Sequence, residues 1–130
     1  MRWLLDTNAF LWFILNDPKL SPAARAIIVD PSHEIEISPA SYWEIAIKIS
    51  LKKYALPGSF QPLMEGQIAA NDFHILQILP AHAAQVAMLG YPTKHKDPFD
   101  RLIVAQARVE VIPVISADAD LDAYGITRIW

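Results

Sequence analysis

The sequence contains no cysteine, which excludes a disulfide framework, a thiolate metal site and a cysteine nucleophile. It also lacks any apolar run approaching the roughly 18 residues that a membrane-spanning helix needs, so we expect no membrane insertion. A signal-peptide pattern is missing, because Asp6 interrupts the first apolar run and no small-residue cleavage site follows it. Together these absences predict a cytoplasmic protein.

Positive charge is scarce, since 11 lysines and arginines face 14 acidic residues and the net charge is −3. This balance argues against a broadly basic nucleic-acid-binding surface, although a global sum can hide a local basic rim. The four histidines are scattered, so no histidine metal site is predicted. Only His95 lies near the acidic residues described below, and we do not expect it to be catalytic. A Gly-x-Ser-x-Gly motif is absent, and no serine–histidine–acid arrangement is visible.

Short apolar segments of strand type alternate with helical segments along the chain. The expected strands cover residues 1–5, 34–38, 73–78, 111–115 and 127–130. The expected helices cover residues 9–15, 22–29, 38–52, 60–70, 80–88 and 98–109, with a helical turn after Asp118. This alternation predicts an α/β fold, a three-layer α/β/α sandwich with a central, mostly parallel sheet of four to five strands. No linker or repeat divides the chain, so we expect a single domain over residues 1–130.

Acidic residues follow several of these strands. Asp6 ends the first strand, and Glu44 lies in the first two turns of the helix after the second. Asp100 lies in the first turn of a later helix, and Asp118 follows the strand that ends near Ile115. The carboxyl ends of parallel strands share one edge of a sheet, where ligands of open α/β sheets bind. The sequence therefore predicts that these four carboxylates converge.

Helix capping is the competing interpretation of each acid, because first turns favour acidic side chains. Two carboxylates about 4 Å apart, however, repel by about 1 kcal/mol in water and about 4 kcal/mol at an effective dielectric constant of 20. A cluster of them persists if protons or a divalent cation neutralise it. Oxygen ligands suit Mg²⁺ or Mn²⁺ rather than zinc.

Four motifs occur in order: Leu5-Asp6-Thr7-Asn8, Trp43-Glu44-Ile45-Ala46, the segment from His95 to Ala107, and Ile115-Ser116-Ala117-Asp118. Over its whole length the chain resembles PIN-domain ribonucleases of the VapC toxin type. The resemblance implies a Mg²⁺- or Mn²⁺-dependent endoribonuclease, a small cognate antitoxin that blocks it, and a homodimer. It also implies that the acids Asp6, Glu44, Asp100 and Asp118 form the catalytic metal site. Asp120 and Asp122 stay open as alternatives for the fourth acid.

The implied mechanism is attack of a metal-activated water on the scissile phosphate, which leaves a 5′-phosphate and a 3′-hydroxyl. Thr7, Asn8 and Ser116 are candidates for hydrogen bonds to phosphate or to the acids, or else they cap the adjacent helices. We expect Lys94, Lys96 and Arg101 to contact RNA phosphates.

Two other functions stay open. In the first, the chain is a non-catalytic PIN-like protein-interaction module whose acids are helix caps. In the second, Asp6 is the aspartyl nucleophile of a phosphotransfer domain. The second is disfavoured because no lysine follows Lys96.

Overall fold

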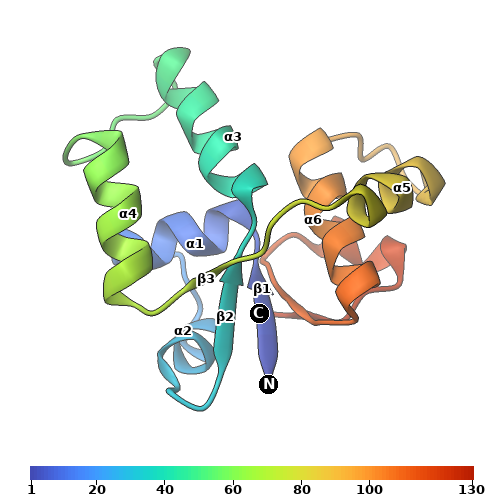
Figure 1. Cartoon of the computed structure of the whole chain (residues 1–130), viewed down its shortest axis with the longest axis horizontal. Coiled ribbons are helices and arrows are strands. Elements are labelled where there is room, and N and C mark those ends of the chain that lie inside the picture. The colour runs from blue at the N-terminus through green and yellow to red at the C-terminus, as the bar shows by residue number, and fades with distance from the viewer.

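A computed structural model describes all residues, Met1–Trp130. Its centre is a five-stranded, all-parallel sheet with the order β3-β2-β1-β4-β5 (Figure 1). The strands are β1 (Arg2–Leu5), β2 (Glu34–Ile37), β3 (His74–Ile75), β4 (Val114–Ile115) and β5 (Arg128–Ile129). Because β1 is the middle strand, the side chain that follows its last residue lies at the centre of the carboxyl edge. The predicted α/β fold is confirmed.

Helices connect the strands. They are α1 (Thr7–Ile14), α2 (Pro22–Val29), α3 (Pro39–Ser50), α4 (Phe60–Ala70), α5 (Pro80–Met88), α6 (Pro98–Glu110) and the 3-10 helix η1 (Ala119–Tyr124). Three of them begin with proline directly after a side-chain cap, at Ser21, Ser38 and Asp97. Proline suits this position because its missing N–H would have no helical partner there. None of the helices is long and apolar enough to cross a membrane.

Alternate residues of β1 face the two helical layers. Trp3 and Leu5 belong to a core cluster that includes residues of α1 and α2. Leu4, between them, belongs to a second cluster that includes four residues of α6. This alternation follows from the two-residue period of a strand. It produces the predicted three layers, with helices on both faces of the sheet.

Several elements differ in length from the sequence-based expectation. The first helix begins at Thr7, two residues early, because Asp6 caps it. The strand expected over residues 111–115 is limited to Val114–Ile115. Pro113 has no N–H to donate, and only its carbonyl joins the sheet by accepting the Leu4 N–H at 3.0 Å. The strand expected over residues 73–78 is limited to His74–Ile75.

A partly buried polar network fixes α6 at the amino edge of the sheet. The Arg2 guanidinium contacts both Glu36 carboxylate oxygens at 2.9 Å and Glu110 Oε1 at 3.1 Å. Glu110 Oε2 lies 3.0 Å from His82 Nε2, and these hydrogen bonds from His82 and Arg2 hold the pKa of Glu110 below its ordinary value. The last turn of α6 is thereby tied to β1, β2 and α5. Its first turn lies at the opposite, carboxyl edge.

Candidate metal site

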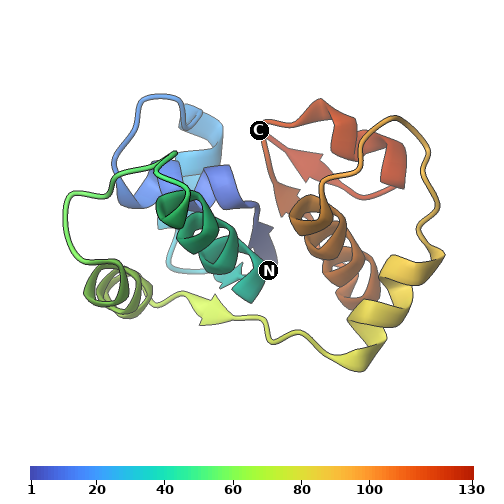
Figure 2. The same ribbon diagram turned by 90° about the horizontal axis from the view of Figure 1, so that it is seen from above.

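Asp6 lies at the carboxyl edge of the central strand and is 5% exposed. Its backbone N–H donates to the Ile115 carbonyl at 3.1 Å, which holds it beside the end of β4. Its Oδ1 accepts the Ala9 N–H at 2.8 Å and so caps α1. Figure 2 views the molecule from above, where α3 and α6 lie on either side of the carboxyl end of β1. Asp6 therefore caps α1 and also lies at the carboxyl end of β1, beside the end of β4.

The environment of Asp6 disfavours its charged form. Burial is the main cause that raises its pKa to about 7, and the negative charges of Asp100 and Asp118 raise it further. Hydrogen bonds from the Ser116 hydroxyl and the Ala9 amide act in the opposite direction. A buried carboxyl near other acids is stabilised by a proton or by a bound cation.

Glu44 approaches the same edge from α3 and is 6% exposed. Its Oε2 lies 2.8 Å from Lys48 Nζ, one turn further along the helix. Its Oε1 is buried and has no hydrogen-bond partner. Glu44 is not part of a capping box, because Ser38 caps α3 by accepting the Ala40 N–H at 3.1 Å. A buried carboxylate oxygen without a partner is costly unless something outside the protein chain binds it.

Asp100 enters from the first turn of α6. Asp97 caps this helix by accepting the N–H groups of Phe99 at 2.9 Å and Asp100 at 3.2 Å. The Asp100 carboxylate makes no cap and instead contacts His95 Nε2 through Oδ2 at 3.1 Å. Burial is the first cause that raises its pKa to about 6; the charges of Asp97 and Glu44 raise it too, and His95 opposes them.

Asp118 completes the group from the segment after β4. Its Oδ1 accepts the Asp120 N–H at 3.0 Å, and its Oδ2 lies 3.9 Å from His95 Nε2. Asp122 forms a pair with Arg128, with N–O distances of 2.8 and 3.0 Å, and Asp120 is exposed. Among these three acids, Asp118 is the one whose charge acts on Asp6.

Four chain segments thus bring acids into electrostatic contact. The charge of Asp100 acts on Asp6, and that of Glu44 acts on Asp100. Ligand atoms of His95, Asp100 and Asp118 all lie within 4.8 Å of one another. Carboxylate oxygens, including the unpartnered Glu44 Oε1, fit a hard divalent cation. The sequence did not predict the contact made by His95; the available signal was its place five residues before Asp100, in the loop that leads into α6.

Thr7, Asn8 and Ser116, the three small polar residues predicted to lie near the acids, have different surroundings. Ser116 is fully buried and hydrogen-bonds to Asp6 and to the Asp118 N–H. Thr7 is buried, and its hydroxyl donates to Ser41 Oγ at 3.2 Å. Asn8 is exposed and lines a surface hollow with residues of α1 and the segment after α3. Of these three residues, only Ser116 contacts two of the acidic residues.

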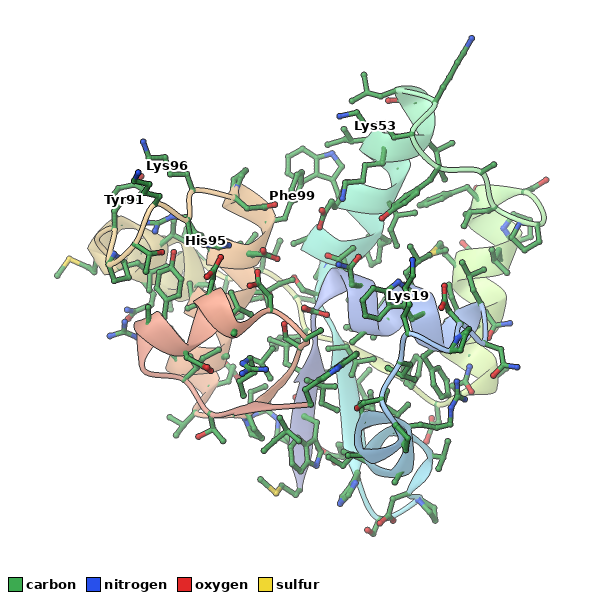
Figure 3. The ribbon with its side chains drawn as sticks, turned by 180° about the vertical axis from the view of Figure 1, so that it is seen from behind. Lys19, Lys53, Tyr91, His95, Lys96 and Phe99 are labelled. Carbon is green, nitrogen blue, oxygen red and sulfur yellow. The ribbon has the colours of Figure 1, made fainter.

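The three basic residues that were expected to contact RNA also differ in their exposure. Lys94 and Lys96 are exposed, and Figure 3 shows Lys96 pointing away from the molecule while His95 lies on the inner side of the same loop. Arg101 is only 5% exposed, and its Nη1 donates to the Gly90 carbonyl at 2.7 Å. Its guanidinium also lies 4.0 Å from the centre of the Tyr91 ring. Arg101 was expected to contact RNA phosphates together with Lys94 and Lys96, but unlike them it is buried.

An aromatic pair lies beside the acids. Trp43 directly precedes Glu44, and Phe99 directly precedes Asp100. Their rings meet edge to face, with centroids 5.4 Å apart and an interplanar angle of 78°. Figure 3 shows Phe99 on the side of α6 that faces α3. Trp43 is 59% exposed, so its indole is open to solvent beside the acids.

Comparisons with known proteins identify the family of the fold. The sequence model of the PIN domain family matches residues 3–126. No curated protein matches the chain.

Solved structures share the fold. One is VapBC2 from Rickettsia felis bound to a promoter DNA fragment, with 14% identity, a TM-score of 0.73, and 99% of this chain and 98% of the other covered. VapBC-1 from nontypeable Haemophilus influenzae has 15% identity, a TM-score of 0.67, and 99% and 97% covered. A toxin–antitoxin complex from Klebsiella pneumoniae has 18% identity, a TM-score of 0.53, and 88% and 85% covered.

Proposed function

The chain belongs to the PIN domain family, and from this premise we propose that it is a single-domain, Mg²⁺- or Mn²⁺-dependent endoribonuclease. The observation that carries the proposal is the convergence of Asp6, Glu44, Asp100 and Asp118 from four segments of the chain. Caps alone would leave Asp6 and Asp100 with raised pKa values and Glu44 with an unpartnered oxygen. A divalent cation among them would remove both costs.

The proposed division of roles follows from what each carboxylate already binds. Asp6 and Asp118 each use Oδ1 as a cap acceptor, so each has its second oxygen for a cation. Asp100 and Glu44 would supply the remaining ligands, and Glu44 Oε1 is also suited to accept a hydrogen bond from the attacking water. When bound, the ion would supply Lewis-acid polarisation and neutralise charge on the phosphate.

The reaction we propose is hydrolysis of an RNA phosphodiester. The water oxygen forms a bond to phosphorus as the bond from phosphorus to the 3′ oxygen breaks. The water gives up a proton to the acidic cluster or solvent, and the leaving 3′ oxygen takes up a proton. The products are a 5′-phosphate and a 3′-hydroxyl, and the 2′-hydroxyl takes no part.

RNA as the substrate is supported by what surrounds the acids. Lys94 and Lys96 are exposed on the loop that leads into α6, where they are suited to contact backbone phosphates. Trp43 offers an exposed indole next to Glu44, and unpaired bases stack on such side chains. Paired bases cannot reach an aromatic ring in this way, so the proposal favours unpaired RNA.

We also propose that the chain is the toxin of a toxin–antitoxin pair and forms a homodimer, as the family resemblance implies. Support for a small protein partner comes from an apolar hollow of about 350 Å³ beside α3. It is lined by Pro39, Tyr42, Trp43, Ala46, Phe60 and Ile78. An amphipathic helix of an antitoxin could bury its apolar face there.

A non-catalytic interaction module is the second candidate, favoured by the cap hydrogen bonds of Asp6 and Asp118. The test is incubation of the purified protein with unstructured RNA in Mg²⁺, Mn²⁺ or EDTA, followed by analysis of the RNA ends. We expect metal-dependent cleavage with 5′-phosphate ends, lost in a folded Asp6→Asn variant. Cleavage that survives EDTA, or 2′,3′-cyclic ends, would contradict the mechanism. Absence of metal binding would favour the module.

A further inference from the structure

We propose that His95 is a positioning residue, which holds the Asp100 carboxylate in its metal-binding orientation and is itself held by Tyr124 and Arg101. The inference rests on the proposed metal site. It begins from the contacts of Asp100, whose carboxylate has His95 Nε2 as its one hydrogen-bond partner, at 3.1 Å. The backbone amides of the first turn of α6 bind Asp97 instead. Without His95, no group of the protein would fix the Asp100 side chain.

A chain of hydrogen bonds continues from His95 away from the acids. His95 Nδ1 lies 2.9 Å from the Tyr124 hydroxyl. That hydroxyl lies 3.3 Å from Arg101 Nη1, which also donates to the Gly90 carbonyl at 2.7 Å. Arg101 is 5% and Tyr124 4% exposed, so the two residues that hold His95 are themselves packed in the protein. The His95 side chain is 8% exposed and has little freedom to turn.

The chemistry of the groups determines the direction of the bonds that Arg101 and Asp100 make. Arginine can only donate, so Arg101 occupies one lone pair of the Tyr124 oxygen. A carboxylate can only accept, so His95 Nε2 carries the hydrogen that points at Asp100. In a neutral ring, Nδ1 then has a lone pair that can accept the Tyr124 O–H at 2.9 Å; the His95 carbonyl, 3.4 Å from the same hydroxyl, is its other acceptor. In the opposite assignment, the Nε2 lone pair would face a carboxylate oxygen, which is repulsive.

The need for positioning comes from the neighbouring charges. Asp100 lies among Glu44, Asp97 and Asp6, and repulsion would turn a free carboxylate toward solvent. When His95 holds one oxygen of the Asp100 carboxylate, the direction of the other oxygen is fixed too, because the carboxylate is planar. Partners of this kind around metal ligands typically change metal affinity or activity by about 10- to 100-fold when they are removed.

The experiment measures Mn²⁺ affinity without RNA, by titration calorimetry and electron paramagnetic resonance, on the full chain. His95→Phe removes the donor, Tyr124→Phe removes only a hydroxyl, and His95→Gln keeps an N–H donor. His74→Gln, an exposed histidine on β3, is the matched control. We expect His95→Phe to weaken Mn²⁺ binding by about 10- to 100-fold and Tyr124→Phe by less. We expect His95→Gln to retain most of the affinity. Thermal unfolding in EDTA verifies that each variant folds.

Kinetics on RNA adds a second readout. The positioning role predicts a lower kcat with an unchanged KM in His95→Phe, and recovery in His95→Gln. Equal Mn²⁺ affinity of wild type and His95→Phe would overturn the positioning role alone. A direct nitrogen coupling from His95 in the Mn²⁺ spectrum would also overturn it, because the ring would then be a ligand. Failure of the wild-type protein to bind Mn²⁺ would overturn the metal site and this inference together.

Discussion

Glu44 and Lys48, one turn apart on α3, form an ion pair in which Nζ lies 2.8 Å from Oε2. The other carboxylate oxygen is buried and has no partner. The two oxygens of Glu44 therefore differ, because Oε2 is held by Lys48 and Oε1 is free for a ligand. Lys48 also keeps a positive charge near a buried anion, which limits the cost of its burial.

The first prediction concerns the free oxygen of Glu44. Glu44→Gln keeps the shape of the side chain and removes its charge. If Oε1 binds the cation or the attacking water, we expect RNA cleavage to fall by at least about 100-fold. The midpoint of thermal unfolding in EDTA should change by only a few degrees, because the substitution preserves packing. Cleavage rates and unfolding are measured on the same preparation.

The matched control is Glu34→Gln, an exposed carboxylate at the start of β2 on the opposite edge of the sheet. We expect its cleavage rate to equal that of the wild type. Full activity of Glu44→Gln would remove Glu44 from the proposed site, while equal losses in both variants would indicate a general effect of charge.

The second prediction is a pH dependence of metal-free stability that comes from Asp6. Its pKa is raised from 3.8 to about 7 in the folded protein, so between these values the folded state binds the proton and the unfolded state releases it. This contribution to stability is fully present below about pH 4 and is lost as pH rises to about 7. At pH 8 in EDTA we therefore expect Asp6→Asn to be more stable than wild type by roughly 2–4 kcal/mol.

Urea unfolding in EDTA at pH 4, 6 and 8 tests this difference. Asp72→Asn, at an exposed position after α4, is the control and should follow the wild-type profile. Addition of Mn²⁺ at pH 8 should stabilise the wild type and leave Asp6→Asn unchanged. Parallel pH profiles of wild type and Asp6→Asn would show that Asp6 does not titrate as described.

The four acids could be predicted from the sequence because their positions depend on a general property of parallel sheets. Each follows a strand or begins a helix at the carboxyl edge, and the order of apolar segments is enough to place them there. Asp118 was harder to separate from Asp120 and Asp122. In the structure Asp122 is paired with Arg128, Asp120 is exposed, and Asp118 is the one whose charge acts on Asp6.

Arg101 shows what the sequence could not predict. A charged residue next to Asp100 in a basic segment is usually exposed, and burial of an arginine depends on partners from elsewhere. Here the partners are Tyr91 and Tyr124, which neither periodicity nor spacing connects to Arg101. The contact between His95 and Tyr124 was missed for the same reason, because it joins residues 29 positions apart.

The third prediction tests whether the exposed lysines Lys94 and Lys96 contact RNA phosphates. Replacement of both Lys94 and Lys96 by alanine removes two charges that are free to contact phosphates. Each lost contact should reduce the slope of log affinity against log salt by about 0.7 for single-stranded RNA. Fluorescence anisotropy in a Glu44→Gln background measures binding without cleavage. Lys19→Ala, at an exposed lysine near α1 (Figure 3), should keep the wild-type slope; an unchanged slope in the double variant would rule out phosphate contacts by this loop.

The last prediction concerns the exposed ring of Trp43, which meets Phe99 edge to face and leaves most of its surface in solvent. Base stacking on an aromatic side chain contributes about 1–3 kcal/mol per base, so Trp43→Ala should raise KM for unpaired RNA by about 5- to 150-fold. Trp43→Phe keeps a stacking surface and should recover much of the loss. The matched control is Met88→Ala, which removes a 79% exposed apolar side chain from α5. The ring also lines the apolar hollow beside α3, so the oligomeric state of each variant must be measured by sedimentation. A raised KM with unchanged mass would support stacking, whereas a raised KM that accompanies dissociation would assign Trp43 to a protein interface instead.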